Sequence, residues 1–170
     1  IGSNALHSNT TGSQNTGLGE NTLSASTTGN DNTAVGYRAL LSNTTGIDNT
    51  AVGRTALDAS STASYNTAVG RDALGGTTTG TQNSGLGWSA LLTNSTGSYN
   101  TAIGSSALYA NTTGDSNVAI GRDALEANTT NGSGVAIGTS ALKAQTTGSL
   151  NTAVGAAALT TLTTGSNNTA

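Results

Sequence analysis

The chain has 170 residues, with five basic and eight acidic side chains and a net charge of −3 at pH 7. It contains no Phe, Met, Cys or Pro and only one Trp, so it cannot build the mixed aliphatic and aromatic core of an ordinary globular domain. The lack of cysteine excludes disulfide frameworks and thiolate metal sites. Charges form no run of either sign, and no stretch approaches the ~20 apolar residues of a membrane span, so we expect neither nucleic-acid binding nor membrane insertion by this segment.

A 17-residue repeat, N-T-A-V-G-x-x-A-L-x-x-x-T-T-G-x-x, runs through the chain ten times without an insertion. Bulk composition rich in Gly, Ser, Thr and Asn is typical of disorder, but a disordered chain has no reason to keep aliphatic residues at one fixed phase. The period predicts one all-β array over 1–170, a β-solenoid or parallel β-roll of ten stacked coils. Because both ends cut through a unit, we expect the array to be a piece of a longer fibrous protein.

Each unit begins with a β-prone segment such as 50–52, which Gly53 ends, and continues with a second apolar step at 56–57. This pattern predicts two short strands per coil, and the abundance of Gly, Thr, Ser and Asn opposes a helix. Aliphatic residues of both segments are expected to fill the coil, while the Ala51 and Ala56 types face partner chains. The predicted core is Val35, Leu40, Val52, Leu57, Val69, Leu74, Leu91, Ile103, Leu108, Ile120, Leu125, Ile137 and Leu142.

The third corner of the unit is Thr-Thr-Gly, in which Gly occupies eight of ten copies and Asn131 and Ala63 the others. Tolerance of Gly and Asn for positive φ predicts a left-handed turn here, with strain at Ala63. An Asn column, interrupted once by Gly134, is expected to form an amide ladder, and a Thr column is expected to tie coil to coil. The predicted ladder residues are Asn32, Asn49, Asn66, Asn83, Asn100, Asn117, Thr45, Thr79 and Thr96.

Single coils of this kind bury little apolar surface. Burial of about two aliphatic side chains per coil contributes roughly 1.5–3 kcal/mol each. This does not offset the conformational entropy lost when a whole unit becomes ordered. Neighbouring residues of a strand point to opposite faces, so one member of each apolar pair can face outward. A second apolar stripe along a rod favours additional burial in a coaxial oligomer.

The segments Val118-Ala119-Ile120-Gly121 and Val135-Ala136-Ile137-Gly138 resemble the head repeats of trimeric autotransporter adhesins. The units also resemble repeats of phage and bacterial tail-fibre-like proteins, a pattern that residues 32–46 follow almost completely. The resemblance implies a homotrimeric parallel β-roll on a cell or virion surface. Adhesin head repeats are typically shorter than this period, which is a departure from that family.

No arrangement of titratable groups breaks the repeat in the way that catalysis requires, since the only histidine is His7 in the most variable column. We therefore expect no enzyme, no cofactor and no calcium ladder. Variable columns are the better place for recognition, because solvent positions are free to differ between units. A candidate recognition corner, for a glycan or a host-surface receptor, consists of Tyr37, Arg38, Arg54, Arg71, Trp88 and Arg122, and the alternative is a merely solvated corner.

The sequence thus predicts an extracellular structural segment, the shaft or head of an adhesin or tail-fibre-like protein, that presents a binding surface. One alternative is a self-polymerising filament subunit, because open coil ends expose unpaired strand edges. Another is an ice-binding solenoid using the Thr44 and Thr45 columns. The adjacency of these two residues opposes that alternative, because a flat two-rank face needs alternate residues.

Overall fold

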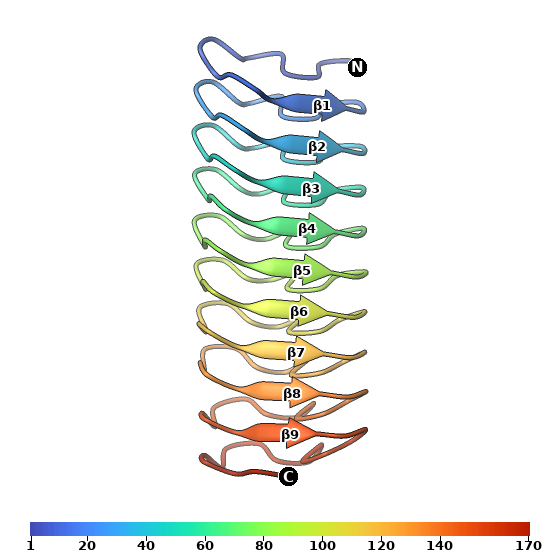
Figure 1. The fold of residues 1–170 in the computed structure, drawn as a ribbon, viewed down its shortest axis with the longest axis vertical. Helices are drawn as coiled ribbons and strands as arrows, with labels where there is room; N and C mark the ends of the chain where they lie inside the picture. The colour runs from blue at the N-terminus through green and yellow to red at the C-terminus, as the bar shows by residue number, and fades with distance from the viewer.

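The structure is a computed structural model that describes residues 1–170, and it is a stack of coils along one axis with the two termini at opposite ends (Figure 1). One short strand lies on the same side of each coil. The nine strands are Thr16–Leu18 (β1), Thr33–Val35 (β2), Thr50–Val52 (β3), Thr67–Val69 (β4), Ser84–Leu86 (β5), Thr101–Ile103 (β6), Val118–Ile120 (β7), Val135–Ile137 (β8) and Thr152–Val154 (β9).

The strands form one parallel sheet in chain order, β1 to β9. Every residue pairs with the residue 17 positions later, as Thr50 does with Thr67 and Val52 with Val69. This register confirms the all-β solenoid with a 17-residue period. A unit without insertions is what such a register requires, because one extra residue would reverse the face on which every later strand side chain lies.

The prediction of a second strand at 56–57 is wrong. Thr55 and Leu57 have φ of 55° and 51°, so the residues on both sides of Ala56 are in the left-handed region and the backbone here is not extended. The segment still bonds to the next coil, since the Leu57 amide donates to the Ala73 carbonyl at 3.1 Å. Hydrogen bonds therefore join the coils here without a second sheet.

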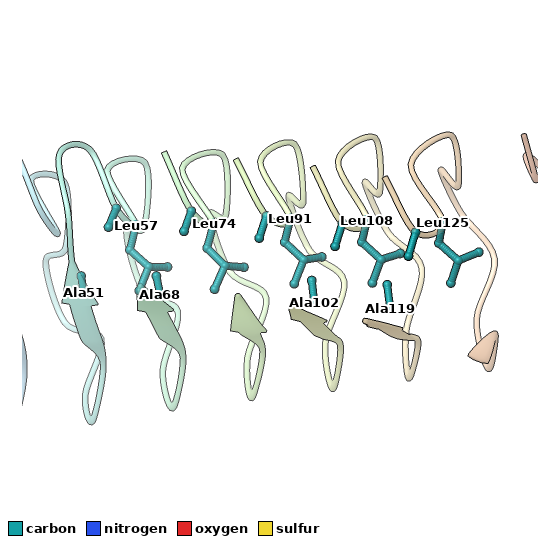
Figure 2. Packing of buried hydrophobic residues seen from close by; sticks show 14 of the residues in the cluster. Ala51, Leu57, Ala68, Leu74, Leu91, Ala102, Leu108, Ala119 and Leu125 are labelled. Carbon is teal, nitrogen blue, oxygen red and sulfur yellow. The ribbon is translucent and has the colours of Figure 1, made fainter. Parts of the chain in front are cut away.

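The core is a column of leucines facing two columns of alanines inside the coils (Figure 2). The predicted leucines are fully buried as expected: Leu40, Leu57, Leu74, Leu91, Leu108, Leu125 and Leu142. Ala51 and Ala56 are also fully buried, so the prediction that they face partner chains is wrong. The inward residue of the strand is alanine in seven strands and glycine, Gly17 and Gly85, in the other two, so no strand places a larger side chain inside.

The valine and isoleucine column lies outside the coil, which corrects the prediction that it fills the core. In a three-residue strand the first and third side chains share one face, so placing Ala51 inside places Thr50 and Val52 outside. Val69 and Ile103 are each 39% exposed. The core residues corrected in this way are Val35, Val52, Val69, Ile103, Ile120 and Ile137, all half-buried or exposed.

The amide ladder along the Asn column is confirmed. Asn49 Nδ2 donates to Asn32 Oδ1 at 3.1 Å and to the Ala63 carbonyl at 2.8 Å, and the Asn49 amide donates to the same Asn32 oxygen at 3.0 Å. The same bonds recur from Asn66 through Asn117. These side chains are buried, so each carbonyl and amide they satisfy would otherwise be a costly unpaired group.

The predicted threonine ties fall one residue earlier in the chain. Thr45, Thr79 and Thr96 are exposed, and their hydroxyls do not bond to a neighbouring coil, which corrects the prediction. Instead Thr44 Oγ1 donates to the Ser61 carbonyl at 2.9 Å, and Thr78 Oγ1 donates to the Ser95 carbonyl at 3.1 Å.

The left-handed turn predicted at the Thr-Thr-Gly glycine is also wrong. Gly46 does not have a positive φ, whereas Asp48, two residues beyond it, has φ of 55°, and its equivalents in the other coils are also positive. Close approach explains the glycine instead, because a Cβ on Gly46 would overlap the Ala63 carbonyl oxygen and Asn43 Oδ1.

Candidate recognition surfaces

The outward side of the sheet carries two parallel columns of side chains, which we call the outer sheet face. One column contains threonine in most coils, with Ser84, Val118 and Val135 as exceptions. The other column is aliphatic in every strand: Leu18, Val35, Val52, Val69, Leu86, Ile103, Ile120, Ile137 and Val154. Neither column contains a charged residue, so the face is a continuous apolar and hydroxyl-bearing stripe along the sheet.

Beside this face, just after the glycine that follows each strand, lies the corner at which the sequence predicts recognition. Tyr37, Arg54, Arg71 and Trp88 occupy this corner in four successive coils, and we call them the corner ladder. Backbone bonds fix their stacking. The Tyr37 carbonyl accepts from the Thr55 amide at 2.9 Å, and the Arg71 carbonyl accepts from the Ser89 amide at 3.0 Å.

The corner ladder is open to solvent. Tyr37 is 41% and Trp88 55% exposed. The Arg54 guanidinium lies over the Tyr37 ring, with its central carbon 6.0 Å from the ring centre, which is the arrangement of a cation–π contact. Arg71 Nε bonds to Asp72 at 3.0 Å.

The other two predicted corner residues are placed differently. Arg38 belongs to the next column, and its Nη2 lies 3.1 Å from Asp58 Oδ2, so it is not part of the ladder. Arg122 does share the column, but its neighbours there are Ser105 and Thr139, and its Nε lies 3.5 Å from Asp123.

Two groups that form ion pairs, Asp58 and Lys143, have perturbed pKa values. Burial raises the pKa of Asp58, and the Arg38 guanidinium opposes that rise without cancelling it. Hydrogen bonds to Glu126 and Asp123 raise the pKa of Lys143, whose Nζ lies 3.0 Å and 3.3 Å from those carboxylates. These partly exposed pairs join adjacent coils along the rod, and each is a modest contribution to stability.

A second polar column, which sequence reasoning missed, lies inside the coil. Asn94 Nδ2 donates to the Gly97 carbonyl at 2.9 Å, and Asn111 Nδ2 donates to Asn94 Oδ1 at 2.8 Å. In other coils this position is Ser26, Ser60, Thr77 or Gln145, and only the last coil has an apolar residue there, Leu162. The variability of the position hid it, although its recurrent polar character was a usable signal.

No pocket indents the surface, and no group of three or more His, Asp or Glu side chains is gathered where it could hold a metal ion. The structure also contains no helix with the length and apolar character needed to cross a membrane. The two features left as candidate sites are extended surfaces, the outer sheet face and the corner ladder.

Comparisons with protein-family models, with curated proteins and with solved structures found no match to this chain.

Proposed function

We propose that this chain is a structural segment of an extracellular fibre or adhesin-like protein, which assembles through its outer sheet face into a coaxial trimer. The observation that carries the proposal is the aliphatic column present on all nine strands, without a charged residue in it or beside it on the face. An apolar stripe of this length is typical of a surface that another chain covers.

The small interior supports the same conclusion. A coil such as that of β3 buries Leu57 against Ala51 and Ala56, which is little apolar surface for the number of residues ordered. Covering Val52 and its equivalents between chains adds an aliphatic contact to every coil. The shared core proposed here uses the Val and Ile column, while the alanines remain inside each chain.

The role of such a rod is mechanical. Hydrogen bonds between coils through backbone, Asn49-type amides and Thr44-type hydroxyls run the length of the sheet. They resist bending and hold the coils at a constant rise. The resemblance of the repeat to adhesin heads and tail-fibre-like proteins supports placing the rod outside the cell or on a virion surface.

The experiment is the solution mass of the protein by light scattering, with Ile103→Lys as the interface variant. Ile103 lies in β6 near the middle of the face and is 39% exposed, so the substitution is tolerated by one chain but places a charge in the shared core. We expect a mass of three chains for the wild type and of one chain for Ile103→Lys, with the β signal in circular dichroism retained.

Thr113→Lys is the matched control, because Thr113 is exposed and lies outside the sheet. Its mass should equal that of the wild type. A monomeric wild type would contradict the shared core, and micrometre filaments would favour the polymerising subunit.

Ice binding is a second candidate because the two columns of the outer sheet face come from alternate strand residues, which is the spacing that a flat two-rank face needs. Thr50 and Val52 project from the same side of β3 with Ala51 between them, so hydroxyls and methyls form two regular ranks. The Thr44 column is unavailable, since its hydroxyls donate to the next coil. A monomer that shows thermal hysteresis would favour this candidate over the trimer.

A further inference from the structure

The corner ladder is not required by the fold. The same column contains Ser3, Glu20, Ser105, Arg122, Thr139 and Ala156 in other coils, and those coils stack in the same register. Tyr37 and Trp88 leave 41% and 55% of their surface exposed, so packing does not explain the choice of large aromatic residues. Trp88 is moreover the only tryptophan of the chain.

The geometry of the ladder suits a linear ligand that runs along the rod. Successive coils in a parallel sheet rise by ~4.8 Å, so the backbones at Tyr37 and Trp88 are about 14 Å apart. An aromatic ring stands at each end, and the two guanidinium groups of Arg54 and Arg71 lie between them in register order. The rise per coil is close to the length that one sugar residue adds to an extended polysaccharide.

The charge of the ladder points to an acidic ligand. The ion pairs of the structure involve Arg38, Arg71, Arg122 and Lys143, which leaves Arg54 as the one Arg or Lys side chain without a carboxylate partner. Arg71 engages Asp72 through Nε alone, so its terminal nitrogens make no hydrogen bond within the protein. Guanidinium groups with free N–H donors bind carboxylate and sulfate groups in a planar, two-point geometry.

We propose that the corner ladder binds an acidic linear polysaccharide. Apolar faces of its sugar rings stack on Tyr37 and Trp88, and its carboxylate or sulfate groups accept hydrogen bonds from Arg54 and Arg71. A single-stranded nucleic acid also has bases that stack on aromatic rings and phosphates that bind Arg. It needs a basic groove that follows its backbone, however, and the net charge of this chain is −3, which disfavours that ligand.

Trp88 provides a direct readout, since every change in tryptophan emission arises at the ladder. The first measurement is acrylamide quenching of the free protein. Efficient quenching is expected from the exposure of Trp88. A shielded tryptophan would mean that the corner is covered in solution and would overturn the proposal.

The binding experiment titrates the protein with dextran sulfate, with neutral dextran of the same length and with polygalacturonate. We expect a saturable change in Trp88 emission with an anionic polymer, weakening as salt is added, and none with neutral dextran. Response to polygalacturonate would identify a carboxylate ligand, and response to dextran sulfate alone would identify a sulfate ligand. Equal response to neutral dextran, or tighter binding of oligodeoxythymidine than of either anionic polymer, would overturn the proposal.

Arg54→Gln and Arg122→Gln are a matched pair of variants. Both remove one charge from the same column, but Arg122 has no aromatic neighbour there and lies two coils, ~10 Å, beyond Trp88. We expect Arg54→Gln to raise the Kd roughly tenfold and Arg122→Gln to leave it within about twofold. Equal effects would show nonspecific attraction and contradict the ladder.

The site is independent of the trimer proposed above, because each ladder lies within one chain. Light scattering on the same samples separates the two results. Loss of the trimer with retained polymer binding would refute the assembly alone, and an intact trimer without polymer binding would refute the ladder alone.

Discussion

Leu57 and its equivalents combine a buried side chain with a left-handed backbone. Leu57 has φ of 51°, and the residues at two further positions of each coil, Thr55 and Tyr65 in this unit, have φ of 55° and 62°. Each such residue costs about 1–2 kcal/mol relative to a right-handed backbone. The cost is offset because these turns direct the leucine inward and return the chain to the same side of the rod for the next strand.

Paired substitutions show how the repeat tolerates exceptions. Ala63, expected to be strained, is fully buried without a positive φ, and the residue three positions before it is Ser60, whereas Asn43 precedes Gly46 at the same spacing. The shorter side chain removes the overlap that a methyl group at Gly46 would have with Asn43 Oδ1. Likewise, Gly134 lacks the side-chain amide of the ladder, and Gln145 of the same unit lies beside it and accepts from Asn151 Nδ2 at 2.9 Å.

The first prediction tests this pairing at Gly97. A Cβ there would overlap Asn94 Oδ1 and the Gly114 carbonyl oxygen, so Gly97→Ala should lower the free energy of unfolding by about 2 kcal/mol. Asn94→Ser should also destabilise, because it removes the bond from Asn111 Nδ2.

In the double variant the two losses should not add, since the serine removes one of the overlaps, as Ser60 does for Ala63. Denaturant unfolding of the four proteins measures this coupling. Strictly additive losses would show that Asn94 does not limit the size of residue 97.

At the scale of the element, the three-residue strand decides which side chains form the core. Side chains of a strand alternate between the two faces, so either Ala51 points inward or its neighbours Thr50 and Val52 do. The larger Leu57 already fills the interior from the opposite side. Alanine therefore faces inward, and the two larger residues of the strand, Thr50 and Val52, form the outer sheet face.

The second prediction compares two neighbouring leucines after β5. Leu91 is fully buried, whereas Leu92 is partly exposed over Gly75. Leu91→Asp should destabilise the fold by more than about 4 kcal/mol, since it removes core packing and buries an unpaired charge.

Leu92→Asp is the control, with an expected loss of about 1 kcal/mol or less because its carboxylate stays in water. Thermal melts followed by circular dichroism distinguish the two variants. Similar melting temperatures would refute the assignment of the leucine column to the core.

The whole molecule is a one-dimensional stack in which each coil contacts its neighbours. Contacts between strands link only adjacent members of the sheet, from β1 with β2 to β8 with β9. Stability in such an array is approximately the sum of coil and interface contributions. The rod can therefore lose a complete coil without losing its architecture.

The third prediction is a register test by deletion. Removing residues 101–117, one full period that contains β6, should leave a folded, shorter rod with a slightly lower melting temperature. Removing residues 101–116 should disrupt the fold from that point on, because every later strand would present its outer face inward. Circular dichroism and hydrogen exchange measure the outcome, and a well-folded 16-residue deletion would contradict the fixed register.

The recurring Gly, Leu and Asn positions were sufficient to predict the solenoid, its period, the leucine core and the amide ladder. These features follow from repetition itself, because identical residues in stacked coils must meet one another. The columnar order of Tyr37, Arg54, Arg71 and Trp88 follows from the same period.

Only the tertiary structure decided which way each side chain points. Alternation within a three-residue strand allows either the middle residue or the two flanking residues to point inward. The narrow interior selected the middle residue, alanine. The left-handed backbone at Leu57 and the close approach at Gly46 are set by contacts with the adjacent coil, 17 residues away. Local sequence patterns predict the coil period, whereas the direction of each side chain depends on packing between coils.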